Sequence, residues 1–96
     1  MRVDTPERES TATLRVGREP GAVSVLATAD ELAYRLAEFG PTRVEDDLAR
    51  FVPAAQRHGA DPMLGSVVLD SNAPDVARQR AFGAMHRQVA RRVIEA

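Results

Sequence analysis

The sequence predicts an α+β fold that is predominantly helical, in which a short N-terminal β-hairpin packs on three to four helices and the longest helix lies at the C-terminus. Two observations support this fold class. Apolar and polar residues alternate only in the first third of the chain, whereas helical spacing and helix-start signals follow from Thr28 onward. A length of 96 residues allows one domain. We expect residues 1–10, which are charged and lack an apolar pattern, to be a disordered tail, and residues 11–96 to form a single small domain.

The hairpin is predicted from two short runs. Residues 11–16 alternate apolar and polar side chains, as a half-buried strand does. Residues 22–27 carry Val23 and Val25 at the same two-residue period, and the turn-rich residues 17–21 could join the two strands. Because an isolated hairpin is only marginally stable in water, we expect it to pack on the helices.

Two capping motifs predict two consecutive helices. Thr28 with Glu31, and then Thr42 with Glu45, have the spacing at which the two side chains can cap each other's free backbone amides. Between them, the Gly-Pro pair at positions 40 and 41 ends the first helix.

The middle of the chain leaves two alternatives open. Pro53 would either kink the second helix or split it, and a kink is favoured because the apolar stripe continues to Ala55. Asp61 and Pro62 provide an N-cap and a first helical residue. Residues 63–70 are either a helix, which is favoured, or a buried strand, since periodicity does not resolve so short an apolar run.

The last helix is predicted to begin at Pro74 and Asp75 and to run to about Ile94. At about 100° per residue, its two faces differ in chemistry. The apolar face carries Phe82, Met85, Val89 and Val93, and the opposite face carries Arg80, Arg87 and Arg91. Arg78 projects from the apolar face, so either the packing is open there or Arg78 reaches an acidic partner such as the cluster at positions 45–47.

The length of this helix predicts an interaction surface. About twenty residues at about 1.5 Å each give a rod as long as a small domain is wide. We therefore expect its apolar stripe to extend beyond the core and to meet another protein or a second copy through Val89, Val93 and Ile94. The stripe of Arg80, Arg87 and Arg91 is either a solvated face or a surface for nucleic-acid phosphates. A pI near 6.1 and 4% aromatic residues argue against nucleic acid.

Catalysis, cofactors and metals are not expected. The absence of cysteine excludes thiolate zinc sites and cysteine nucleophiles. His58 and His86 lack the spacing of a metal-binding pair, and the adjacent carboxylates at positions 45–47 would point in different directions from a helix. Ser66 follows a glycine but lacks the second glycine of a nucleophile elbow.

No secretory signal or membrane-spanning run is visible in the sequence, which favours a cytoplasmic protein without a membrane partner. The use of 13 arginines and no lysine is typical of a high-GC bacterial coding bias.

Residues 11–39, read as strand, turn, strand and helix, resemble the start of some bacterial immunity proteins, and this resemblance implies a protein that neutralises a toxin by binding it. The sequence thus predicts a small non-catalytic protein-protein interaction module that binds through its C-terminal helix: an adaptor, an immunity-type inhibitor or a regulatory subunit. The alternatives are a nucleic-acid-binding regulator that uses the arginine stripe, and a small structural subunit of a larger assembly.

Overall fold

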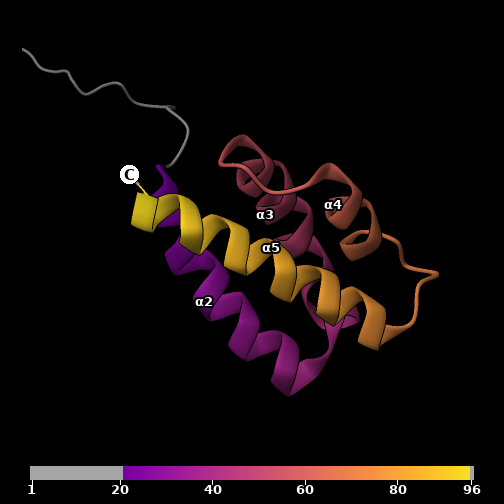
Figure 1. Cartoon of the computed structure of the whole chain (residues 1–96). Coiled ribbons are helices and arrows are strands. Elements are labelled where there is room, and N and C mark those ends of the chain that lie inside the picture. Colours follow the sequence, from indigo (N-terminus) through magenta and orange to yellow (C-terminus); the bar gives the residue numbers. More distant parts are fainter. Residues whose placement is uncertain (1–20, 96) are drawn as a thin grey trace, which may run out of the picture.

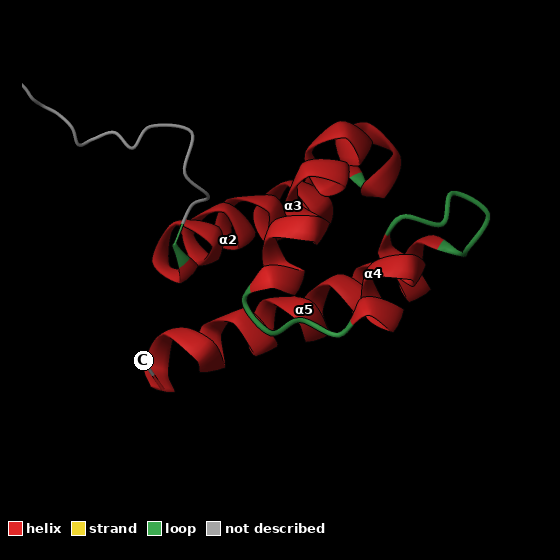
Figure 2. Cartoon of the chain, turned by 90° about the horizontal axis from the view of Figure 1, so that it is seen from above, coloured by secondary structure: helices red, strands yellow, loops and turns green. Residues whose placement is uncertain are grey.

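The computed structural model describes residues 21–95, and all regular structure in this part of the chain is helical (Figures 1 and 2). The elements in order are α2 (Ala22–Phe39), the 3-10 helix η1 (Pro41–Val44), α3 (Glu45–Arg57), α4 (Pro62–Val68) and α5 (Asp75–Glu95).

The predicted α+β class is wrong, because residues 22–27 form the first turns of α2 rather than the second strand of a hairpin. The buried positions of α2 are Val25, Ala29, Leu32 and Leu36, whose spacing is that of one helical face. Val23 and Val25 do not share a face, since Val23 is exposed and Val25 is buried. The resemblance to immunity proteins depended on the second strand and is lost with it. The predicted strand at residues 11–16 and the tail at residues 1–10 lie outside the described residues.

Neither predicted capping motif begins a helix. Gly21 is the N-cap of α2, and the Thr28 hydroxyl, inside the helix, donates a hydrogen bond to the Ser24 carbonyl at 3.1 Å. Thr42 lies within η1, and Val44 is the N-cap of α3, with no side-chain capping bond. A threonine can bond the carbonyl of the preceding turn as readily as it caps, so the motif alone does not fix a helix start.

Of the remaining helix predictions, the split at Pro53 is excluded and the two later helices are confirmed. Although Pro53 lies inside α3, the helix continues from Glu45 to Arg57 and is not split. Asp61 caps α4, where its carboxylate accepts a hydrogen bond from the Met63 amide at 2.9 Å, so the predicted helix alternative holds for this segment. The last helix ends at Glu95, one residue from the predicted end.

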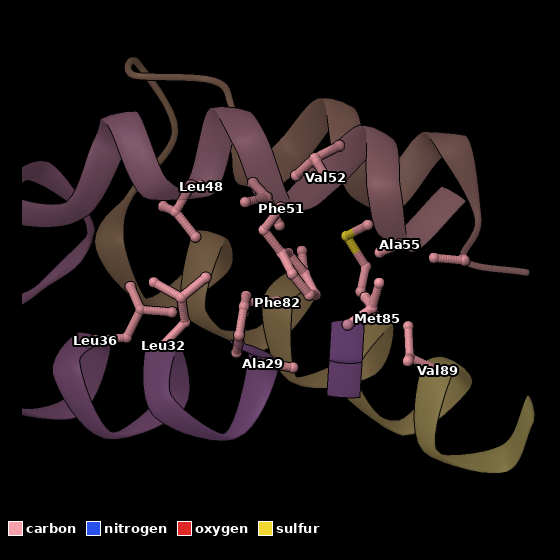
Figure 3. Close-up of a cluster of buried hydrophobic side chains, with 14 of the residues drawn as sticks. Ala29, Leu32, Leu36, Leu48, Phe51, Val52, Ala55, Phe82, Met85 and Val89 are labelled. Atoms are coloured by element: carbon pink, nitrogen blue, oxygen red, sulfur yellow. The ribbon is translucent and has the colours of Figure 1, made fainter. Parts of the chain in front are cut away.

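The helices enclose one apolar core (Figure 3). α2 and α5 lie side by side and antiparallel, with the C-terminal end of α5 beside the start of α2 (Figure 1). α3 packs across them, and its Phe51 ring meets Phe82 of α5 at a centroid distance of 5.1 Å. α4 packs against α3 and α5. The largest fully buried apolar side chains come from all four α-helices: Leu32, Leu48, Val68, Met85 and Val89.

Candidate interaction surfaces

The residues predicted to bind a partner through the apolar stripe lie at different depths. Val89 is fully buried in the core, Val93 is half-buried, and Ile94 is 84% exposed. Only Ile94 is therefore freely accessible to a partner on the folded domain. The three arginines of the predicted stripe, Arg80, Arg87 and Arg91, are all exposed.

α2 and α5 together present a surface that we call the outer face. It comprises the positions that point away from α3 and α4 on the two helices, namely Val23, Ala27, Asp30, Tyr34, Ala37 and Glu38 of α2 and Val76, Arg80, Gly83, Arg87, Ala90 and Ile94 of α5. Four of the seven large hydrophobic side chains exposed in residues 21–95 lie on it: Val23, Tyr34, Val76 and Ile94. None of the seven belongs to α3. The four on the outer face are spread along the helix pair, since Val76 and Ile94 lie 18 residues apart on α5, about 27 Å along its axis.

Small residues contribute to the lining of the line where α2 and α5 meet, together with Leu36, Gln79, Phe82 and His86. A hollow of about 200 Å³ there includes Ala33, Ala37 and Gly83. Gly83 faces open space, because a Cβ atom at this position would contact only the Arg87 guanidinium, at 3.7 Å. His86 and Asp30 bridge the same line with a distance of 2.7 Å between Nε2 and Oδ1. A neighbouring helix could therefore approach this line closely.

The contribution of α2 to this surface was not predicted from the sequence. Assigning residues 22–27 to a strand separated Val23 and Ala27 from Tyr34, although the three positions fall on one side of a continuous helix. The spacing of Val23, Ala27 and Tyr34, which is that of one side of a helix, was the signal in the sequence that could have identified this surface.

A separate groove of about 330 Å³ lies between α2 and α3. Its apolar lining comes from Val25, Leu32, Phe51 and Ala54. Asp47 lies at its edge and forms ion pairs with Arg35 at 2.8 Å and with Arg50 at 2.5 Å. Thr28 also lines the groove, but its hydroxyl is bonded to the Ser24 carbonyl. The lining also includes Glu31, Arg35 and Arg50, so an apolar group in this groove would lie beside charged side chains.

Arg78 reaches the acidic cluster, as one of the two sequence alternatives predicts. Its side chain is buried, with Nε donating a hydrogen bond to the Val68 carbonyl at 2.9 Å and Nη1 contacting Glu45 Oε2 at 3.2 Å. These contacts join α5 to the end of α4 and to the start of α3. Arg78 is thus part of the packing and is not available to a ligand.

The histidines lie in different surroundings. His86 faces Asp30, whereas His58 caps the C-terminal end of α3 and lines a hollow with Arg92 and Glu95. Within residues 21–95, no three His, Cys, Asp or Glu side chains are grouped so that they could hold a metal ion. No helix in the same range combines the length and the apolar content needed to cross a bilayer.

Comparisons with protein-family models, with curated proteins and with solved structures find no match to this chain. The function is therefore argued from its surfaces alone.

Proposed function

We propose that the chain is a small, non-catalytic protein-protein interaction module of the cytoplasm and that it binds its partner through the outer face of α2 and α5. The observation that carries this proposal is that four of the seven exposed large hydrophobic side chains of residues 21–95 lie on that face: Val23, Tyr34, Val76 and Ile94. Removing such side chains from water is the main driving force of protein association, and aromatic residues are frequent among those that contribute most. Adaptor, inhibitor, regulatory subunit and structural subunit are all forms that this function could take.

The exposed arginines support a second candidate, binding to nucleic acid. Arg80, Arg87 and Arg91 run along one side of α5 and could contact phosphates. The apolar side chains and Asp30 on the same face are less suited to a polyanion than to a protein. Binding to phosphates would be lost steeply as salt rises, so a band-shift assay with random-sequence DNA and RNA at low and high salt tests this candidate.

Site-specific cross-linking in cells tests the first proposal. A photoreactive amino acid replaces Ala27, which is exposed on the outer face, or Ser66, which is exposed on α4 and serves as the matched control. We expect irradiation to give a discrete adduct of protein mass from position 27 and none from position 66, and a second substitution, Tyr34→Asp, to abolish it. Equal adducts from both positions, or none from position 27, would contradict binding through the outer face.

A further inference from the structure

We infer that the partner of the outer face is a second copy of this chain, related by a two-fold axis parallel to the helices, so that α2 of each copy lies on α5 of the other. This inference rests on the proposed function and names the partner for the same surface. In such a dimer, each copy uses the same patch, so the patch must be complementary to itself.

The charges of the outer face are complementary to themselves. Where α2 faces outward its charged residues are acidic, Asp30 and Glu38, and where α5 faces outward they are basic, Arg80 and Arg87. Arg91 lines the hollow beside His58. Charged residues of the other sign lie elsewhere on both helices. Arg35 of α2 is turned toward α3, where it pairs with Asp47. On α5, Asp75 lies near Gly40 and Glu95 lines the hollow beside His58.

The axis must run parallel to the helices to match these charges. With this axis, the acidic edge of α2 meets the basic edge of α5 twice. A two-fold axis perpendicular to the helices would instead place α2 on α2 and α5 on α5, with like charges opposite each other. Like charges at an interface cost several kcal/mol, so the parallel axis is favoured.

The residues of α5 that lie level with a given residue of α2 within one copy also lie level with it across the dimer. Rotation about an axis parallel to the helices leaves every residue at its own height along that axis. Within the chain, Asp30 lies level with His86, to which it is bonded, and Leu36 lies level with Gln79, whose amide reaches the Leu36 carbonyl at 3.5 Å. Across the dimer, Asp30 of one copy is then level with Arg87 of the other. Glu38 falls within about one helical turn of Arg80.

Side-chain sizes agree with this register. Tyr34 falls within about one residue of Gly83, so the largest side chain of the α2 edge meets the position of α5 that has none. At the end of the pair, Val23 is level with the neighbourhood of Ile94. These two side chains are 70% and 84% exposed in the single chain. The same rotation thus pairs opposite charges, a large residue with a small one, and two exposed apolar residues.

A charge-reversal series measured by sedimentation equilibrium of the full chain tests the inference. We expect the wild type to dimerise, and Arg80→Glu and Glu38→Arg each to weaken dimerisation by on the order of tenfold or more, because like charges then face each other. The double variant should recover most of the wild-type affinity. Arg43→Glu, in η1 and away from the outer face, is the matched control and should leave the affinity unchanged.

A second arm uses size instead of charge. Gly83→Leu should abolish dimerisation by filling the space opposite Tyr34, and Tyr34→Ala should partly restore it when combined with Gly83→Leu. Circular dichroism of every variant establishes that the helices are intact.

The outcomes separate this inference from the proposed function. A wild type that stays monomeric at all concentrations, or a dimer that none of these substitutions weakens, overturns the second-copy inference. In either case, an adduct of position 27 with a different protein would still support binding through the outer face. If no adduct forms and the chain is monomeric, both proposals fail. A double charge reversal that remains monomeric overturns the register.

Discussion

Arg78 shows how a single charged residue can be part of a small core. A guanidinium that leaves water needs partners for its N–H groups, and Arg78 finds the Val68 carbonyl and the Glu45 carboxylate. The two bonds differ in environment, because the Glu45 side chain is 44% exposed whereas the hydrogen bond to the Val68 carbonyl is buried. Water can replace Arg78 at Glu45, but it cannot easily do so at Val68. The bond to the Val68 carbonyl should therefore contribute more to stability than the ion pair.

This difference predicts the order of two substitutions. Arg78→Ala should lower the free energy of unfolding by about 2–4 kcal/mol, because it creates a cavity and leaves a buried carbonyl without a donor. Glu45→Gln should cost about 1 kcal/mol or less, because the amide oxygen can still accept a hydrogen bond from Arg78. Urea unfolding of both variants measures the two costs. A cost for Glu45→Gln as large as that for Arg78→Ala would show that the ion pair dominates.

Residue-scale features were predictable where they depend on one helix alone. The position of Arg78 on the apolar face of α5 indicated either open packing or an acidic partner such as the cluster at positions 45–47, and the structure has the second of these, a contact with Glu45. The burial of Val89 was not predictable in the same way. Helical periodicity identifies the side on which a residue lies, but how far the core extends along that side is determined by the neighbouring helices.

At the scale of elements, the length of α2 explains why Val89 is buried. Val89 was predicted to meet a partner because the last helix is longer than the helices expected before it, the first of which was expected to begin at Thr28. α2 begins at Ala22 instead and adds Val25 to the core beside that end of α5. The confirmed helix at residues 62–68 had a strong local signal in Asp61 and Pro62, whereas the start of α2 has only Gly21 and no side-chain cap. Without a local signal, two valines at a two-residue period favoured the wrong element.

Gly65 sets how closely α3 and α4 pack. A Cβ atom at this position would lie 2.8 Å from Val52 Cγ1 and 2.4 Å from Gln56 Nε2. The glutamine side chain can move aside, but Val52 is a buried, β-branched core residue and has little freedom to do so. The two helices can therefore keep their present separation only if position 65 carries no side chain.

Gly65→Ala should consequently destabilise the domain by about 1–3 kcal/mol through overpacking, although alanine is intrinsically the better helix former by about 1 kcal/mol. Ser66→Ala, at the exposed neighbouring position of the same helix, is the matched control and should change stability by less than about 0.5 kcal/mol. Thermal or urea unfolding of the two variants decides the point. If Gly65→Ala were neutral or stabilising, the contact with Val52 would not limit the approach of α3 and α4.

At the scale of the whole molecule, the groove between α2 and α3 and the outer face of α2 and α5 lie on different sides of α2. The groove between α2 and α3 opens on the side of α2 that carries Arg35, whereas the outer face lies on the side that carries Tyr34. A dimer formed through the outer face would leave both grooves open to solvent. Self-association and the binding of an apolar group between α2 and α3 are therefore compatible, and variants of one surface can be examined without altering the other.

Dimerisation would also make the stability of the chain depend on its concentration. Association stabilises the folded state by mass action, so the Tm of a folded dimer that unfolds to single chains rises with protein concentration. For a domain of this size, we expect a tenfold increase in concentration to raise the Tm of the wild type by about 3–6 °C. Arg80→Glu weakens association while leaving the core unchanged, so its Tm should lie below that of the wild type at each concentration, and Arg80→Glu combined with Glu38→Arg should recover most of the wild-type Tm. Calorimetry at several protein concentrations measures the Tm of the wild type, of Arg80→Glu and of the double variant. A wild-type Tm that does not change with concentration would mean that α2 and α5 are stable together without a second copy, and that the exposed side chains of their outer face are covered by a different partner.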